Sequence, residues 1–210
     1  MKKILSILLV IMLIITFVQI RNMYALYKDE LSGEYETSLG KWNVKVNGTD
    51  IEYVIVQSKN NDYYLTHNIE KKYNKAGWVF ADYRNKLDGT DKNIVIYGHN
   101  MKDNSMFATL ENILKEEWYK KEENYIVEFI TAKGSQKYQV FSTYKIKNED
   151  YYIKTEFQDN EFEEFINKIK NRSIKNFNID ITKEDNILTL STCADNNKYR
   201  IVLHAKNIDV

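Results

Sequence analysis

The chain has 210 residues, of which 30 are basic and 30 are acidic, so its formal net charge is zero. This length suffices for one domain with a hydrophobic core, and the balanced charge excludes an overall electrostatic attraction to nucleic acid. Aromatic residues make up 13% of the chain and include 16 tyrosines, a composition that excludes a disordered tail and favours β-structure. The chain has one cysteine, Cys193, so an intrachain disulfide is excluded and this residue is either an inert packing residue or a reactive thiol.

An apolar segment occupies residues 4–20 and follows the basic pair Lys2 and Lys3. At about 1.5 Å per residue, a helix of this segment is about 25 Å long, near the lower limit for crossing a bilayer. No small-residue cleavage site follows it, which favours an uncleaved anchor over a signal peptide. We therefore expect residues 1–21 to be the cytoplasmic tip and membrane anchor of a single-pass protein of the cell membrane, with the remainder of the chain extracellular.

The rest of the chain divides into a linker and one domain. Residues 22–40 predict a juxtamembrane helix and linker, and residues 41–210 carry many short apolar or alternating runs typical of strands. These runs predict a mainly β fold, either a barrel or a sandwich. We expect strands at residues 42–46, 51–56, 63–66, 77–81, 93–97, 125–131, 137–146, 187–192 and 200–205.

Two segments have helical periodicity instead. Apolar residues from Met106 to Trp118 recur at helical spacing after the capping candidates Asn104 and Ser105. A second helix is predicted at about 160–171, where acidic residues come early and basic residues late, as the helix dipole favours. We expect both helices to pack on the β-structure.

Cys193 stands at a strand end, and Arg200 opens the strand that follows. If the two strands are antiparallel neighbours, the thiol and the guanidinium can share a pocket, where a fixed cation favours the thiolate and binds an oxyanion. A nucleophilic cysteine also needs a proton carrier, and the chain has three histidines. His99, which follows an apolar strand and a glycine, is favoured; His204, inside a strand on the face of Arg200, is second, and His67 lies in a turn-like segment.

Several motifs resemble those of sortases. Thr189-Leu-Ser-Thr-Cys193 matches the T-L-S-T-C signature, with an arginine seven positions later, and Tyr97-Gly-His-Asn100 matches the histidine motif. Further stretches resemble class B sortases in particular, and the resemblance covers about residues 40–206. These stretches are residues 61–65, 77–85 and 100–107, and the helix predicted at 160–171 is similar to one that class B sortases insert between late strands.

The resemblance implies an eight-stranded β-barrel with N-terminal helices and a catalytic set of Cys193, His99 and Arg200, with His67 and His204 as structural residues. It implies a cysteine transpeptidase that cleaves a sorting signal after its threonine, in an N-P-Q-T-N-like or P-x-T-G-like motif, through a thioacyl-enzyme. Its partners would be surface proteins that carry this signal and an amine of peptidoglycan or lipid II. No cofactor, metal or nucleic acid is expected.

Four residues near these motifs are candidates for substrate binding: Ser191 and Thr192 beside the nucleophile, Tyr97 and Leu65. Ordinary packing or strand polarity is an equal alternative for each of them. Two other functions stay open. A membrane-anchored cysteine peptidase or cell-wall amidase would use the same residues but release the acyl group to water, and a non-catalytic β-barrel binding module would carry an inert Cys193.

Overall fold

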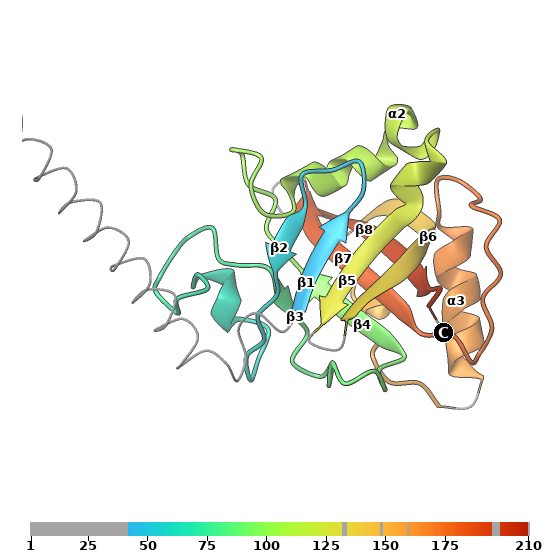
Figure 1. The fold of residues 1–210 in the computed structure, drawn as a ribbon, viewed down its shortest axis with the longest axis horizontal. Coiled ribbons are helices and arrows are strands. Elements are labelled where there is room, and N and C mark those ends of the chain that lie inside the picture. The colour runs from blue at the N-terminus through green and yellow to red at the C-terminus, as the bar shows by residue number, and fades with distance from the viewer. Residues whose placement is uncertain (1–41, 132–133, 148, 159, 195–197, 210) are drawn as a thin grey trace, which may run out of the picture. The chain divides into compact units, whose positions relative to one another are not determined.

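The computed structural model describes residues 42–131, 134–147, 149–158, 160–194 and 198–209, with the backbone alone for residues 193 and 194. In this part of the chain, eight strands form one sheet in the order β2-β1-β5-β6-β8-β7-β4-β3 (Figure 1). All neighbours are antiparallel except β4 and β7, which are parallel. The strands are β1 (Trp42–Val46), β2 (Glu52–Val54), β3 (Phe80–Ala81), β4 (Asn93–Tyr97), β5 (Ile126–Thr131), β6 (Gly134–Lys147), β7 (Ile187–Ala194) and β8 (Tyr199–Asn207).

The sheet curls until its first and last strands meet. Val56, just after β2, forms an isolated parallel bridge with Phe80 in β3, and the N–H of Ala81 donates to the carbonyl oxygen of Val56 at 2.9 Å. This short pairing closes the barrel. The predicted mainly β, eight-stranded barrel is therefore confirmed, whereas the predicted N-terminal helices lie outside the described residues.

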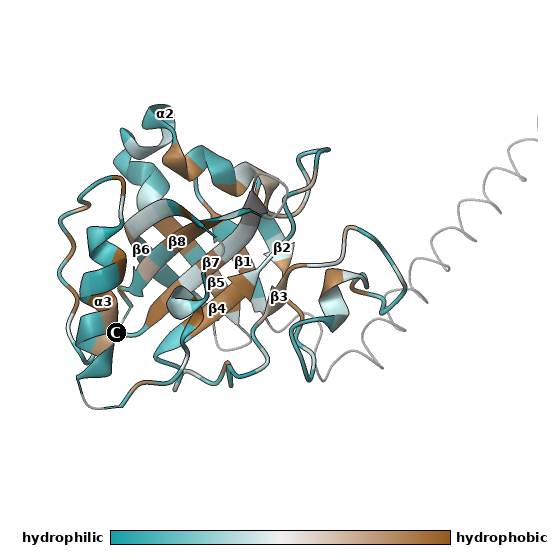
Figure 2. Cartoon of the chain, turned by 180° about the vertical axis from the view of Figure 1, so that it is seen from behind, coloured by the Kyte–Doolittle hydropathy of each residue, from teal (hydrophilic) through white to brown (hydrophobic). Residues whose placement is uncertain are grey.

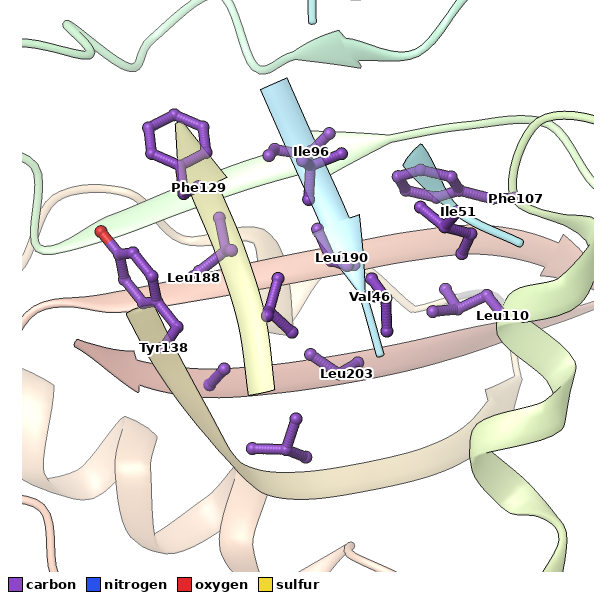
Figure 3. Close-up of a cluster of buried hydrophobic side chains, with 14 of the residues drawn as sticks. Val46, Ile51, Ile96, Phe107, Leu110, Phe129, Tyr138, Leu188, Leu190 and Leu203 are labelled. Atoms are coloured by element: carbon purple, nitrogen blue, oxygen red, sulfur yellow. The ribbon is translucent and has the colours of Figure 1, made fainter. Parts of the chain in front are cut away.

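The central strands are buried on both faces. One cluster of apolar side chains fills the interior of the curled sheet, where Ile96, Leu188, Leu190 and Leu203 meet residues of the other strands (Figure 3). A second cluster lies on the outer face and includes Ile187 and Val202 from the same strands. Because neighbouring residues of a strand point to opposite faces, β7 and β8 need apolar residues at consecutive positions.

Helix α3 (Glu161–Asn171) covers the outer face, as the sequence predicted. Its buried side chains are Phe162, Phe165, Ile166 and Ile169, at the spacing of one helical face. Burying each of them contributes about 1.5–3 kcal/mol to folding. Teal and brown segments alternate along α3 in Figure 2, and brown segments occur in the strands of the sheet, so the helix is amphipathic.

The helix predicted from Met106 to Trp118 is not continuous. A 3₁₀ helix (Ala108–Leu114) is followed by Lys115 in an extended conformation and then by the one-turn helix α2 (Glu116–Tyr119). The fully buried residues Phe107, Leu110 and Ile113 recur every three positions. This spacing fits the three residues per turn of a 3₁₀ helix better than the 3.6 of an α-helix.

The strand predicted at residues 63–66 is wrong, because Tyr63–Leu65 is a 3₁₀ turn. Asn60 starts it: its side-chain oxygen accepts the backbone N–H groups of Asp62 and Tyr63 at 3.0 and 2.9 Å. Such a local bond competes with strand pairing, and it overrides the β preference of two tyrosines. Two further 3₁₀ turns are Glu122–Tyr125 and Tyr151–Ile153.

The localisation predicted from the sequence requires correction. No helix in the described part of the chain is long and apolar enough to cross a membrane. The segments on which the prediction rested, residues 1–21 as an anchor and 22–40 as a juxtamembrane helix and linker, lie outside that part. The described residues therefore give no support to the predicted single-pass protein with an external catalytic domain.

Candidate active site

A cavity of about 300 Å³ lies where β4 and β7 end and β8 begins. Its walls come from these strand ends and from two loops, around residues 61–65 and 149–153. The cavity brings together six of the seven residues that the sequence nominated for catalysis or substrate binding. These six are Leu65, Tyr97, His99, Ser191, Thr192 and Arg200.

The seventh residue, Cys193, is placed by its backbone. It lies in β7 directly after Thr192 and is paired across the antiparallel ladder with Arg200 in β8. The predicted pairing of the two strands that carry the thiol and the guanidinium is therefore confirmed. Residues opposite each other in an antiparallel ladder have Cα atoms about 4.5–5.5 Å apart, so the two positions are close neighbours.

His99 reaches the same place from a strand far away in sequence. The parallel pairing of β4 with β7 sets Tyr97 beside Ser191, an offset of 94 positions, and the N–H of Gly98 extends it by donating to the carbonyl oxygen of Ser191 at 3.2 Å. His99 lies two residues past Tyr97, as Cys193 lies two residues past Ser191, so both follow this last pair toward the same end of the sheet. The ends of three adjacent strands thus gather the backbone positions of Cys193, His99 and Arg200.

The His99 ring is held in one orientation. Its Nε2 lies 2.8 Å from the carbonyl oxygen of Leu65. Because a carbonyl can only accept, Nε2 carries a hydrogen and donates it, which leaves Nδ1 for other partners. Gly77, at φ +58°, packs against the ring: a Cβ there would lie 3.0 Å from the His99 Cδ2 and would clash with the carbonyl oxygen of Tyr64.

Ser191 and Thr192 form the β7 wall of the cavity. Both are buried, and the Ser191 Oγ lies 3.0 Å from the hydroxyl of Tyr152. The Thr192 Oγ1 has no hydrogen-bond partner among the described residues. A buried hydroxyl without a partner costs about 1–3 kcal/mol.

Sequence reasoning missed the polar group behind Tyr97. The Tyr97 hydroxyl donates to Oδ2 of Asp82 at 2.7 Å, and Arg84 donates to both oxygens of this carboxylate at 2.8 and 2.6 Å. Asp82 is fully buried and stands outside the cavity lining. A signal was available, because Asp82 and Arg84 directly follow an apolar strand, but the local sequence does not indicate which residues they contact.

The other two histidines are outside this site. His204 is fully buried between Tyr144 and Thr189, each 2.8 Å from one of its ring nitrogens. Burial lowers the pKa of His204 from 6.5 to about 3, so the ring is neutral at physiological pH. His67 stacks on Tyr63 with ring centres 4.1 Å apart. Neither residue lines the cavity, which fits the structural part expected of both.

No group of three or more His, Cys, Asp or Glu residues able to hold a metal ion occurs in the described residues. That the reaction needs no metal or cofactor stays a prediction from the sequence.

Comparison with known proteins gives consistent matches. The profile of the Sortase domain matches residues 44–208. Sortase B of Staphylococcus aureus (strain NCTC 8325 / PS 47) is 39% identical over 171 residues, which cover 80% of this chain and 69% of that protein. Sortase B of Listeria monocytogenes serovar 1/2a is 40% identical over 162 residues, which cover 75% of this chain and 65% of that protein.

Solved structures agree with these relatives. The structure of Clostridium perfringens sortase B superposes with a TM-score of 0.78 at 34% identity and covers 87% of this chain and 100% of that chain. A complex of Staphylococcus aureus sortase B with substrate gives a TM-score of 0.74 at 37% identity and covers 81% of this chain and 80% of that chain.

The fold and the relatives together define a cysteine transpeptidase of the sortase type. A non-catalytic binding module is therefore set aside. The chain belongs to the sortase family, and its matches place it in class B.

Proposed function

We propose that residues 41–210 are the catalytic domain of an enzyme that cleaves the sorting signal of a surface protein after its threonine and joins the protein to an amine of peptidoglycan or lipid II. The signal is an N-P-Q-T-N-like or P-x-T-G-like motif. Two structural neighbours support the two substrates, because one is a sortase B in complex with substrate and the other a sortase B in complex with triglycine. Triglycine carries a free amine, as the acceptor must.

The acyl group is carried by Cys193. Its thiolate attacks the threonine carbonyl carbon, so a C–S bond forms and the carbonyl oxygen becomes an oxyanion. The permanently charged guanidinium of Arg200 donates hydrogen bonds to this oxyanion. The C–N bond then breaks, and His99 as imidazolium protonates the departing nitrogen. An incoming amine attacks the thioester, gives a proton to His99 and releases the thiolate.

The proton travels through Nδ1 of His99. The bond from Nε2 to the carbonyl oxygen of Leu65 occupies the other ring nitrogen in both protonation states. The same bond fixes the ring plane, so little orientational freedom is lost when the peptide binds. Substrate contacts are assigned to Ser191, Thr192, Tyr97 and Leu65, which all line the cavity.

One observation carries this proposal. The parallel register of β4 with β7 and the antiparallel register of β7 with β8 bring the positions of His99, Cys193 and Arg200 to one end of the sheet. His99 and Arg200 line the same cavity there. A nucleophile, a proton carrier and an oxyanion donor at one cavity are the set that acyl transfer requires.

The test uses the full chain with N-P-Q-T-N and P-x-T-G peptides, each with and without triglycine. We expect mass spectrometry to detect a thioester on Cys193 and, with triglycine, a peptide joined to the amine. The matched Cys193→Ala variant should give neither product. The rival peptidase or amidase predicts cleavage at a rate that triglycine does not change and no joined product, and this result would overturn the proposal.

A further inference from the structure

A buried carboxylate stands directly behind the cavity wall. Asp82 is 0% exposed and follows β3, and its two oxygens accept five hydrogen bonds. Three come from Arg84: Nε at 2.8 Å, Nη2 at 2.6 Å and the backbone N–H at 3.0 Å. The other two come from the Tyr97 hydroxyl at 2.7 Å and the Asn61 Nδ2 at 2.9 Å.

These bonds reach three separate walls of the cavity. Tyr97 belongs to the end of β4, and Asn61 belongs to the loop before the 3₁₀ turn that holds Leu65. Arg84 extends the contact to the third wall, because its Nη2 also donates to the carbonyl oxygen of Ile153 at 2.9 Å. Asn61, Tyr97 and Ile153 all line the cavity, whereas Asp82 and Arg84 do not.

The carboxylate is ionised. Burial alone would raise the pKa of Asp82, but hydrogen bonds from Arg84, Tyr97 and Asn61 outweigh burial and hold that pKa below its usual value. An ionised carboxylate can only accept hydrogen bonds. The Tyr97 O–H and one N–H of the Asn61 side chain therefore point to Asp82, and the Asn61 Oδ1 accepts the backbone N–H of Tyr83 at 3.0 Å.

We propose that Asp82 is a positioning residue that fixes Tyr97, Asn61 and, through Arg84, Ile153 in the arrangement that binds the substrate peptide. The inference rests on the proposed function, because it takes the cavity to be the peptide site. A purely structural part for Asp82 would stabilise the fold without a separate effect on peptide binding. The two possibilities are distinguished by binding measurements on folded protein.

The first variant is Asp82→Asn, which keeps the shape but replaces one acceptor oxygen by a donor group. At least one of Tyr97 and Arg84 then lacks its acceptor, so the three cavity walls are no longer all held by hydrogen bonds through residue 82. We expect the peptide KM to rise about tenfold with kcat within about twofold, the size expected for one lost charge-assisted hydrogen bond. In a Cys193→Ala background, the peptide Kd measured by calorimetry should rise by the same factor.

Asp185→Asn is the matched control. Asp185 pairs with Lys206 at 2.9 Å and accepts the backbone N–H of Thr182, so it too is an aspartate held by a cation and a backbone group. It precedes β7, about 20 Å from the cavity end of that strand at about 3.3 Å per residue. Its substitution should lower thermal stability and leave KM and Kd unchanged.

Tyr97→Phe removes the hydroxyl that faces Asp82 and keeps the ring, and it replaces Asp82→Asn if that variant does not fold. It should raise KM several-fold. The KM of the double variant should be no higher than that of Asp82→Asn alone, because both changes disrupt the same hydrogen-bond network. Unchanged KM and Kd in both single variants, or additive effects in the double variant, would overturn the inference. If the wild-type chain does not join peptide to triglycine, the proposed function fails instead, which is a different result.

Discussion

Acid should destabilise this protein through His204, and the size of the effect can be worked out from its surroundings. The Thr189 hydroxyl donates its hydrogen to the Asn93 Oδ1 at 2.7 Å, so it must accept from Nδ1–H of His204. The Tyr144 hydroxyl then donates to Nε2. The neutral ring is fully satisfied, whereas an imidazolium would direct a second N–H at a hydroxyl already arranged to donate.

The pKa of His204 falls from 6.5 to about 3 on folding, because the ring is completely buried. Below pH 6.5 the unfolded chain therefore binds a proton at His204 that the folded protein does not bind, so the free energy of unfolding rises with pH. The stabilisation is fully present above pH 6.5 and is lost progressively down to about pH 3. Between pH 7 and pH 5 the loss is about 2 kcal/mol, since each pH unit below 6.5 costs about 1.4 kcal/mol.

Urea unfolding of the full chain at pH 7 and pH 5 measures this loss. The lowered pKa values of Asp82 and Asp185 do not contribute there, because stabilisation by a carboxylate of lowered pKa disappears only near and below its unfolded pKa of 3.8. His204→Gln keeps one donor and one acceptor without titrating, so it should abolish the pH dependence, and His67→Gln should keep it. Equal stability of the wild type at the two pH values would refute the reasoning.

Three further predictions concern the site and its support. Gly98→Ala should lower the free energy of unfolding by about 1–3 kcal/mol, because its Cβ would lie 2.5 Å from the buried ring of Phe107. Thermal or urea unfolding measures this change, and an unaltered free energy would show that the ring can move. Cys193→Ala should abolish joining of peptide to triglycine, with less than about 1 kcal/mol change in unfolding free energy, and residual turnover would exclude Cys193 as nucleophile. Arg200→Lys should lower kcat by about a hundredfold in the same assay, because a compact ammonium cannot replace the guanidinium donors, and near-normal kcat would remove Arg200 from the oxyanion site.

Much of the fold was predictable because local pattern and tertiary environment agree. The bounds of β1 and β4 coincide with the predicted strands, and α3 differs from its prediction by about one residue. The predictions were wrong in short segments where a side-chain hydrogen bond or an ambiguous apolar spacing determines the local structure. Residues 63–65 turn because the Asn60 side-chain oxygen accepts the backbone N–H groups of Asp62 and Tyr63. Residues 106–118 split because apolar spacings of 3 and 3.6 residues look alike over two turns.

Which residues line the cavity was largely predictable, whereas the hydrogen bonds behind its wall were not, and the roles of the lining residues stay predictions. Motif residues such as His99 and Ser191 stand at strand ends, and the cavity gathers them as expected. The buried carboxylate of Asp82 could not be connected to Tyr97 and Asn61 in advance, because hydrogen bonds between residues 15 and 21 positions apart depend on how loops fold over the sheet. Periodicity reports which face a residue occupies and not its partner across a loop.

Whether the three residues His99, Cys193 and Arg200 meet depends on the register of the strands that carry them, which the local sequence does not report. A hairpin of β7 and β8 brings Cys193 and Arg200 together by itself, but His99 arrives only if β4 pairs in parallel and in the right register. One chain of buried hydrogen bonds crosses these three strands, from His204 in β8 through Thr189 in β7 to Asn93 in β4. A slip of one residue would break this chain, move His99 by about 3.3 Å along β7 and turn each side chain of β4 to the other face. The histidine that takes no part in the chemistry therefore helps to set the register on which the chemistry depends.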